Sequence, residues 1–171
     1  MKKTSIAIIA AAALFAACAP KTQEFAAEDG SAKAVNVIGT DQWKIYDATG
    51  KEVMTDYDSM RVVELGEAGH PKTVVYYRGD ERHQYQYYSS MKLYSEEHTT
   101  NGVKQGRWVY YHPNGNIWAE TTFKDGIEDG LYRSMRENGA PNIIGHYKEG
   151  VRVGTWEVYA PNGELVRAIE Y

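Results

Sequence analysis

The chain has 171 residues, including 14 tyrosines, 4 tryptophans and a single cysteine, and its formal net charge is −4. This length allows one ordinary domain or a modest array of repeats. The acidic balance and the lack of a basic patch argue against a nucleic-acid partner, and one cysteine excludes an intramolecular disulfide bond.

Residues 1–17 have the layout of a secretory signal peptide. Lys2 and Lys3 precede an apolar stretch that is too short to span a bilayer comfortably, and small residues then lead to Cys18. A retained membrane helix is the alternative interpretation. Cleavage before Cys18 removes two lysines and shifts the formal net charge from −4 to −6.

The sequence LFAAC, which ends at Cys18, resembles the lipobox of bacterial lipoproteins. In that family the cysteine receives lipid and becomes the mature N-terminus, so the resemblance implies a membrane anchor at Cys18. Phe15 departs from the leucine that is usual three residues before the cysteine. The family rule for the next residue, here Ala19, implies the outer membrane and leaves open which side of it the protein faces.

The rest of the chain divides by composition. Residues 18–35 are small, polar and aperiodic after the cysteine, which predicts a lipidated flexible tether. We expect a β-hairpin repeat domain over residues 36–171. Within it, residues 36–101 are expected to hold degenerate units and residues 102–171 regular units of 24 residues.

Fainter copies of the later pattern occur before residue 101. WKIYDATG places Trp43, Tyr46 and Gly50 at the spacing seen in the regular units, and RVVELGEAG keeps only the apolar run and a glycine. YQYYSSMKLY keeps Tyr85 and Tyr88 without an Asn-Gly turn. Counting these copies, we expect five or six hairpins in total.

The regular pattern occurs three times. Its recurring residues are Gly106, Gly130 and Gly154; Trp108, Tyr132 and Trp156; Tyr111, Met135 and Tyr159; Asn114-Gly115, Asn138-Gly139 and Asn162-Gly163; and Phe123, Tyr147 and Tyr171. Aromatic and branched runs on both sides of Asn-Gly predict a β-hairpin in each unit. No long apolar stripe of helical period follows residue 35, so we expect an all-β fold with minimal helix.

The turn residues predict a register for the first regular hairpin. Pro113 suits the second position of a type I turn, with Gly115 following in the left-handed conformation. That turn puts Tyr111 opposite Ile117, and Tyr110 opposite Trp118. Because side chains alternate between faces, one face is expected to carry Tyr111, Ile117, Thr121 and Phe123, and the other Trp108, Tyr110 and Trp118.

The pattern of Gly, Trp/Tyr, Tyr, Asn-Gly, Phe/Tyr and Gly positions resembles the MORN repeats (membrane occupation and recognition nexus). It is most similar to the bacterial variant in proteins labelled YwqK-type antitoxins. The resemblance is strong from Gly102 to Tyr171 and weak from Trp43 to Thr100. It implies tandem antiparallel β-hairpins that form one elongated, curved single sheet.

The sequence contains no familiar catalytic or metal-binding pattern. The sequence has no phosphate-binding glycine loop followed by lysine, no HExxH pair, and no free thiol once Cys18 carries lipid. None of the histidines is spaced from another ligand as in a metal site; they are His70, His83, His98, His112 and His146. KDGIEDG contains three acidic residues, but the equivalent loops lack them. We expect a noncatalytic protein with no metal and no cofactor.

Three classes of function remain open. Extended repeat surfaces commonly bind partners, which favours a lipid-anchored binding or scaffold protein. The family label suggests an antitoxin or immunity protein that neutralises a toxin. Aromatic-rich hairpins also suit a glycan or cell-wall binding module, although large aromatics are equally needed to bury area in a thin sheet. The expected partners are the membrane, through the lipid, and a protein or a glycan.

Aromatic residues that break the repeat are the candidates for recognition, because the fold alone explains the recurring ones. Tyr110 and Trp118 appear in one unit only, and Trp108 is expected on the same face. The residues at the equivalent positions are Ser134 and Val158 for Tyr110, and Asn142 and Val166 for Trp118. Packing of this pair against the preceding hairpin is the alternative interpretation.

The last run of alternating residues, from about Leu165 to Tyr171, is expected to form an edge strand of the sheet. An edge strand offers unpaired backbone N–H and C=O groups to another strand. Arg167 and Glu170 are its charged residues. The edge is therefore a second candidate contact, through addition of a partner strand or self-pairing.

Overall fold

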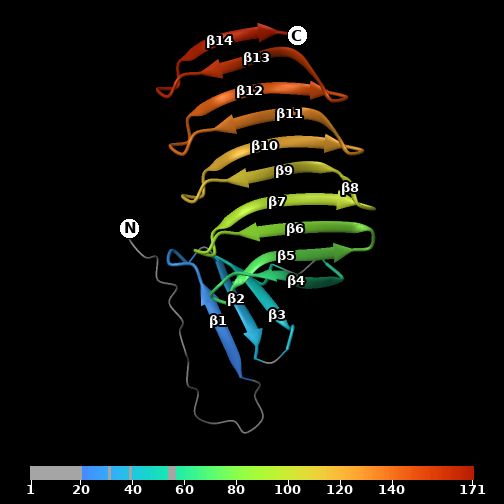
Figure 1. Cartoon of the computed structure of the whole chain (residues 1–171), viewed down its shortest axis with the longest axis vertical. Coiled ribbons are helices and arrows are strands. Elements are labelled where there is room, and N and C mark those ends of the chain that lie inside the picture. Colours follow the sequence, from blue (N-terminus) through green and yellow to red (C-terminus); the bar gives the residue numbers. More distant parts are fainter. Residues whose placement is uncertain (1–20, 31, 39, 54–56) are drawn as a thin grey trace. The chain divides into compact units, whose positions relative to one another are not determined.

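The structure is a computed structural model, and it describes residues 21–30, 32–38, 40–53 and 57–171. In these residues all the regular elements are β-strands (Figure 1). They are β1 (Thr22–Ala26), β2 (Ala32–Val37), β3 (Trp43–Asp47), β4 (Ser59–Leu65), β5 (Pro71–Arg78), β6 (Glu81–Tyr87), β7 (Leu93–Thr100), β8 (Val103–Lys104), β9 (Gly106–Tyr111), β10 (Ile117–Lys124), β11 (Ile127–Met135), β12 (Pro141–Lys148), β13 (Val151–Tyr159) and β14 (Leu165–Glu170). The predicted all-β class is confirmed, whereas the signal segment and Cys18 lie outside the described residues.

Hydrogen bonding joins the strands into two antiparallel sheets. One has three strands in the order β1-β2-β3, and the other has eleven in the order β14-β13-β12-β11-β10-β9-β7-β6-β5-β4, with β8 paired to β7. The predicted sheet of tandem antiparallel hairpins is confirmed for β4 to β14, whereas β3, which was also expected in it, belongs to the three-stranded sheet. The chain also divides into two compact units: unit 1 contains the described residues up to Arg78 with 86–92, and unit 2 contains 79–85 with 93–171.

Unit 1 begins with strands where a flexible tether was expected. β1 and β2 are antiparallel, and Phe25, Ala34 and Ile45 face one another across the three strands. All three side chains are buried, Phe25 to 1% and Ala34 to 0% exposure. The tether prediction for residues 18–35 is thus wrong from Thr22 onward. The short runs here alternate polar and apolar residues closely enough to supply one apolar face to a sheet.

Unit 1 also contains the β4–β5 hairpin, which was expected from an apolar run and a glycine. Its turn places Gly69 at φ 79°, and the Gly69 N–H donates to the carbonyl of Gly66 over 2.8 Å. In β5 the consecutive residues Val74, Val75 and Tyr76 are all buried. Burial on both faces of a strand explains why its sequence is a continuous apolar run rather than an alternation.

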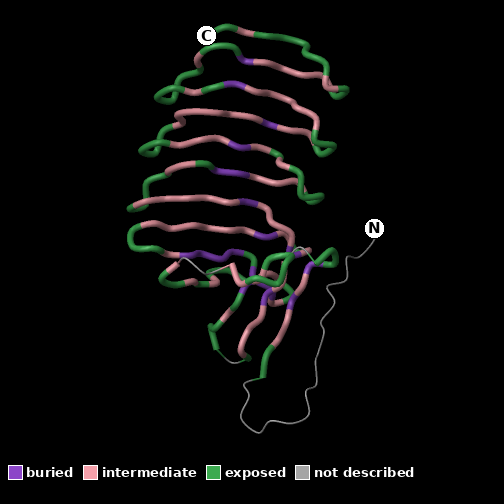
Figure 2. The backbone as a smooth tube through the Cα atoms, turned by 180° about the vertical axis from the view of Figure 1, so that it is seen from behind, coloured by how far each residue is buried: buried purple, intermediate pink, exposed green. Residues whose placement is uncertain are grey.

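Unit 2 consists of hairpins that follow one another in chain order, as Figure 1 shows for the yellow to red strands. Apart from the short β8, each strand pairs with the strands before and after it, so most contacts are local along the chain. In β9 to β13 one or two positions of each strand are buried and are flanked by half-buried and exposed residues, whereas β14 has no buried residue (Figure 2). The sheet therefore repeats a small set of neighbour contacts instead of enclosing one central core.

The predicted Asn-Gly turns are present in all three regular hairpins. Gly115, Gly139 and Gly163 have φ values of 91°, 82° and 87°. Each glycine N–H donates to the carbonyl three residues earlier, over 2.8, 2.8 and 2.9 Å. Each is a four-residue turn whose last residue is the left-handed glycine, as Pro113 indicated for the first unit.

A second kind of turn closes the opposite end of each repeat. In the pairs Asn101-Gly102, Asp125-Gly126 and Glu149-Gly150 both residues have positive φ. Two consecutive positive φ values between paired strands define a type I′ turn, whose twist matches that of a hairpin. The unit of 24 residues is therefore one long turn, one tight turn and the two strands between them.

The regular 24-residue repeat begins one hairpin before residue 102. In the β6–β7 hairpin Met91 takes the place of the turn glycine, with φ 64°, and its N–H donates to the carbonyl of Tyr88 over 2.9 Å. Tyr87 is therefore the counterpart of Tyr111. The expectation that Tyr85 and Tyr88 hold the repeat spacing is wrong by one residue, because no glycine marks the turn in the sequence.

The register of the first regular hairpin contains a bulge that the sequence did not reveal. Tyr111 pairs with Ile117 as expected, but Tyr110 pairs with Ala119, so Trp118 is the extra residue. One extra residue moves all later side chains to the opposite face. Phe123 consequently lies on the face of Trp108, with ring centroids 5.3 Å apart, and the expected division of faces is wrong beyond Trp118.

Candidate functional site

Trp108, one of the three predicted recognition residues, is a packing residue. Its side chain is only 8% exposed, and its indole N–H donates to the carbonyl of His98 over 2.9 Å. Trp156 repeats this arrangement two units later: it is 4% exposed and donates to the carbonyl of His146 over 3.1 Å. Since the bond recurs with the repeat, Trp108 belongs to the architecture of the sheet.

Tyr110 and Trp118 lie together, as predicted, although they are not register partners. Their ring centroids are 6.3 Å apart and nearly perpendicular. The Tyr110 ring also meets that of Tyr94 edge-on at 5.9 Å, and Trp118 lies 6.2 Å from the ring of His112. We call Tyr94, Tyr110, His112 and Trp118 the aromatic patch. Tyr94, Tyr110 and His112 are half-buried, whereas Trp118 is 47% exposed.

The pKa of the Tyr110 phenol reflects this position. Burial raises the pKa first, and the nearby Glu97 carboxylate raises it further. Tyr110 therefore stays neutral well above physiological pH, and its hydroxyl is hydrogen-bonded to Glu97 beside the exposed indole. The patch combines a large apolar surface with a polar tip, which is the chemistry that protein interfaces favour in Tyr and Trp.

The other units show what the sheet uses at these two positions. In the second unit the Asn142 amide donates to the Ser134 hydroxyl over 3.2 Å. In the third unit Val158 pairs with Arg167, and Val166 is the bulged residue. A small polar pair or an aliphatic pair thus occupies these two positions at the same bulge. The two later hairpins therefore form without the aromatic pair of the first unit, whereas the preceding β6–β7 hairpin has Gln86 and Tyr94 at these positions.

A charged cluster occupies the opposite face of the first regular hairpin. The Glu120 carboxylate is buried and accepts from Arg107 over 2.6 Å and from Arg133 over 3.0 Å. Burial alone would raise the pKa of Glu120, but the hydrogen bonds from the two guanidinium groups lower it below its ordinary value. Beside them, the Tyr111 hydroxyl donates to Glu96 over 2.5 Å.

A second aromatic cluster lies further along unit 2 and was not singled out from the sequence. Trp156 contacts the rings of Tyr132, Tyr147 and Tyr171 at centroid distances of 5.4, 5.0 and 6.3 Å. The Arg152 guanidinium lies 4.5 Å from the centre of the Trp156 ring. Only about 140 Å³ of open space remains beside this cluster. The recurring aromatics, together with the arginine above them, pack against one another.

The predicted edge strand is β14, which ends the sheet in the described residues. Leu165 and Val166 are exposed on it, and the Glu170 carboxylate accepts a hydrogen bond from the Thr155 hydroxyl. The structure thus presents the backbone edge that the sequence analysis expected. Whether that edge meets a partner stays a prediction.

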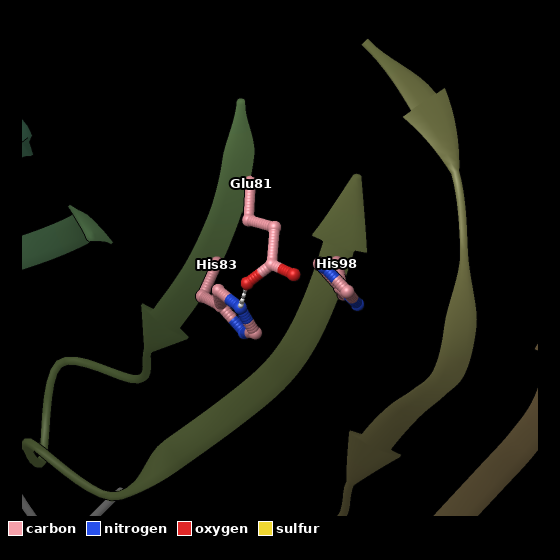
Figure 3. Close-up of side chains that lie close together, drawn as sticks. All are labelled: Glu81, His83 and His98. Carbon is pink, nitrogen blue, oxygen red and sulfur yellow. Dashed lines mark ion pairs between the residues drawn. The ribbon is translucent and has the colours of Figure 1, made fainter. Parts of the chain in front are cut away.

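One cluster of metal-ligand side chains also escaped the sequence analysis. Glu81, His83 and His98 come from the neighbouring strands β6 and β7, and one ligand atom of each lies within 4.8 Å of the others (Figure 3). The histidines are 15 residues apart in the chain, so no short spacing marked them.

The residues that the structure describes contain no helix with the length and apolar character needed to cross a membrane.

Comparison with protein families identifies part of the chain. Residues 104–125 and 152–171 match the MORN repeat variant family. A comparison with curated proteins gives no match. The matched segments cover the first and third regular hairpins, where the resemblance to MORN repeats was strongest. These two segments of the chain are similar to MORN repeat variants.

Proposed function

We propose that this protein is a lipid-anchored, noncatalytic envelope protein that binds a protein partner through its MORN repeats, with Tyr110 and Trp118 in the contact. The observation that carries the proposal is the exposed Trp118 at a position where the two later hairpins use Asn142 and Val166. A side chain that the fold does not need, and that leaves half of an indole in water, favours a role in recognition.

The anchor rests on the signal layout and on Cys18. A single cysteine directly after an apolar segment fits lipidation, and Ala19 favours the outer membrane. Metabolic labelling with a fatty-acid analogue tests this step. The wild-type protein should be labelled and sediment with the membrane, whereas Cys18→Ala should be unlabelled and either soluble or unprocessed. An unlabelled wild-type protein would contradict the anchor without touching the repeat surface.

The recognition step can be tested with residues that the chain itself supplies. The double variant Tyr110→Ser, Trp118→Asn installs the pair that Ser134 and Asn142 form in the next hairpin. Because that pair suits the same bulge, the sheet should fold while the aromatic surface is lost. We expect affinity for the captured envelope partner to fall about tenfold or more, as for loss of interface hot spots.

The matched control is Val158→Ser, Val166→Asn, which installs the same pair in the third hairpin and keeps the aromatic patch. It should bind the partner as the wild type does. Capture from envelope extracts, with crosslinking and mass spectrometry, provides the partner for both measurements. If the aromatic double variant binds as tightly as the control, the patch is not the contact.

The nature of the captured partner separates the remaining functions. A secreted toxin whose activity is blocked by the wild-type protein, and not by the aromatic double variant, would establish an antitoxin role. Retention of cell-wall glycan fragments with the same dependence on Trp118 would establish a glycan-binding module instead, since sugars stack on exposed indoles. Either result would replace the general scaffold function by a specific one.

A further inference from the structure

The geometry points to a binding site for a divalent transition-metal ion of the zinc class, formed by Glu81, His83 and His98. Two imidazoles and one carboxylate are a common ligand set for Zn²⁺, and three protein ligands leave one position for water or another donor. This site is independent of the aromatic patch and goes beyond the proposed binding function.

Strand geometry brings the three side chains together. Glu81 and His83 are two residues apart on β6, so they lie on the same face of that strand. His98 enters from β7, the neighbouring strand in the sheet. Figure 3 shows the Glu81 carboxylate turned toward the His83 ring, where Oε2 and Nε2 are 3.7 Å apart.

The repeat register supports the pairing of the two histidines. Arg107 pairs directly with Thr122, and Leu131 pairs directly with His146. Moving either pair back by whole units of 24 residues gives His83 opposite His98. Their rings are stacked, with centroids 4.2 Å apart and an interplanar angle of 12°.

The same comparison shows that these ligands break the repeat. The cross-strand pairs at the equivalent positions are Arg107/Thr122, Leu131/His146 and Thr155/Glu170. The residues in the place of Glu81 are Gln105, Asp129 and Val153. Only the β6–β7 hairpin, among the described regular hairpins, combines two histidines with a carboxylate. The sheet itself therefore gives no reason for this combination.

The backbone of His98 is held in position, and its ring has a nitrogen that can bind a metal ion. Its backbone carbonyl accepts from the Gln105 N–H over 3.0 Å and from the Trp108 indole over 2.9 Å. Its buried Nε2 has no hydrogen-bond partner among the residues that the structure describes. Leaving a buried ring nitrogen unsatisfied costs free energy, which a bound metal ion would offset.

Small side-chain rotations are enough to close the site. The three ligand atoms lie within 4.8 Å of one another. Around a tetrahedral Zn²⁺ with bonds of about 2.0–2.1 Å, neighbouring ligand atoms are roughly 3.3 Å apart. The required movement is on the order of 1–1.5 Å, which rotation about the side-chain bonds supplies while the two strands stay in place.

Zinc titration of the full chain tests the proposal. The protein is extracted in detergent, carries no polyhistidine tag, and is freed of metal with a chelator before titration with Zn²⁺ by calorimetry. We expect one tight site per chain. His98→Phe keeps an aromatic ring against His83 but removes the ligand nitrogen, and should weaken Zn²⁺ binding by about tenfold or more.

His146→Phe is the matched control, because His146 occupies the equivalent position two units later opposite Leu131. It should leave the zinc affinity unchanged. Glu81→Gln, which keeps the side-chain shape, provides a second test should His98→Phe fail to fold. Electron paramagnetic resonance of the Cu²⁺-loaded protein should show coupling to two imidazole nitrogens in the wild type and to one in His98→Phe.

Three outcomes would overturn the site. They are no uptake of Zn²⁺ in the micromolar range by the wild type, unchanged affinity in both His98→Phe and Glu81→Gln, or an equal loss in His146→Phe. None of these outcomes bears on the aromatic patch, because capture of the envelope partner is measured separately.

Discussion

The two units of this protein bury their side chains in different ways. In unit 1 the largest fully buried residues come from several strands, among them Phe25, Ile45 and Tyr76. In the regular hairpins of unit 2 few positions are buried, and the buried apolar side chains are those of Trp108, Val109 and Trp156. Unit 1 thus buries large side chains from several of its strands, whereas unit 2 repeats contacts between neighbouring hairpins. A destabilising substitution should therefore affect different sets of strands in the two units.

The largest effect is expected at Trp156. Trp156→Ala removes a buried indole that contacts three tyrosine rings and donates to the His146 carbonyl. We expect a loss of about 3–5 kcal/mol in the free energy of unfolding of the affected hairpins. Hydrogen exchange should show faster exchange from β11 to β14, with little change in unit 1.

Ile45→Ala is the matched change in unit 1, where the side chain is fully buried. It should destabilise unit 1 by about 2–5 kcal/mol and leave exchange in β11 to β14 unchanged. If each substitution accelerates exchange equally across both units, the chain folds as one cooperative block and the distinction between the units fails.

The same difference explains what could be read from the sequence. The turns at Gly115, Gly139 and Gly163 are local, so residue types alone located them. The bulge at Trp118 is set by pairing between strands, and nothing in the sequence separates it from a regular hairpin. The strands around Phe25 were missed because their short alternation matters only once β2 and β3 pack beside them.

The candidate sites follow the same rule. Tyr110 and Trp118 were found because a repeat provides its own reference at each position. The Glu81, His83 and His98 cluster was missed because the phase of the β6–β7 hairpin was not recognised. Met91 stands at its turn where glycine stands in later units, and this concealed the register that pairs the histidines. Had the phase been counted back from Gly115, the pair would have appeared.

A change at the turn separates backbone strain from packing. A Cβ atom added at Gly115 meets no atom within 4 Å, so we expect the cost of Gly115→Val to come from the φ of 91°. We expect a loss of about 1–3 kcal/mol. Chemical denaturation measures it. Gly115→Asn is the control, since asparagine tolerates the left-handed region better. It should lower the free energy of unfolding by clearly less than Gly115→Val does. Equal losses in the two variants would mean that strain at φ is not the cause.

The buried carboxylate gives a smaller, pH-dependent effect. Glu120→Gln should cost about 1–3 kcal/mol at neutral pH, less than a fully buried ion pair because Arg107 and Arg133 are partly exposed. The folded-state pKa of Glu120 lies below its ordinary value of 4.5, so its contribution is present above that pH. It is lost as the pH falls through the lower, folded-state pKa.

Denaturation curves at neutral and acidic pH provide the measurement for Glu120. The wild type and Glu120→Gln should differ most at neutral pH and converge as the carboxylate becomes protonated. Glu137→Gln, at an exposed turn position, is the control and should show no such convergence. A difference between wild type and Glu120→Gln that stays constant down to acidic pH would show that the two arginines do not stabilise the ionised form.

The last and smallest effect concerns the edge at β14. Appending one regular 24-residue unit after Tyr171 should pair with the backbone of β14 and cover Leu165 and Val166 while leaving Tyr110 and Trp118 unchanged. If recognition uses the aromatic patch, partner affinity and oligomeric state should both survive this extension, measured by the same capture assay and by light scattering. Loss of binding in the extended protein, with full binding in the Tyr110→Ser, Trp118→Asn variant, would transfer the contact to the edge, where strand addition supplies the hydrogen bonds. Because an added repeat changes neither the face nor the bulge at Trp118, the two results cannot be confused.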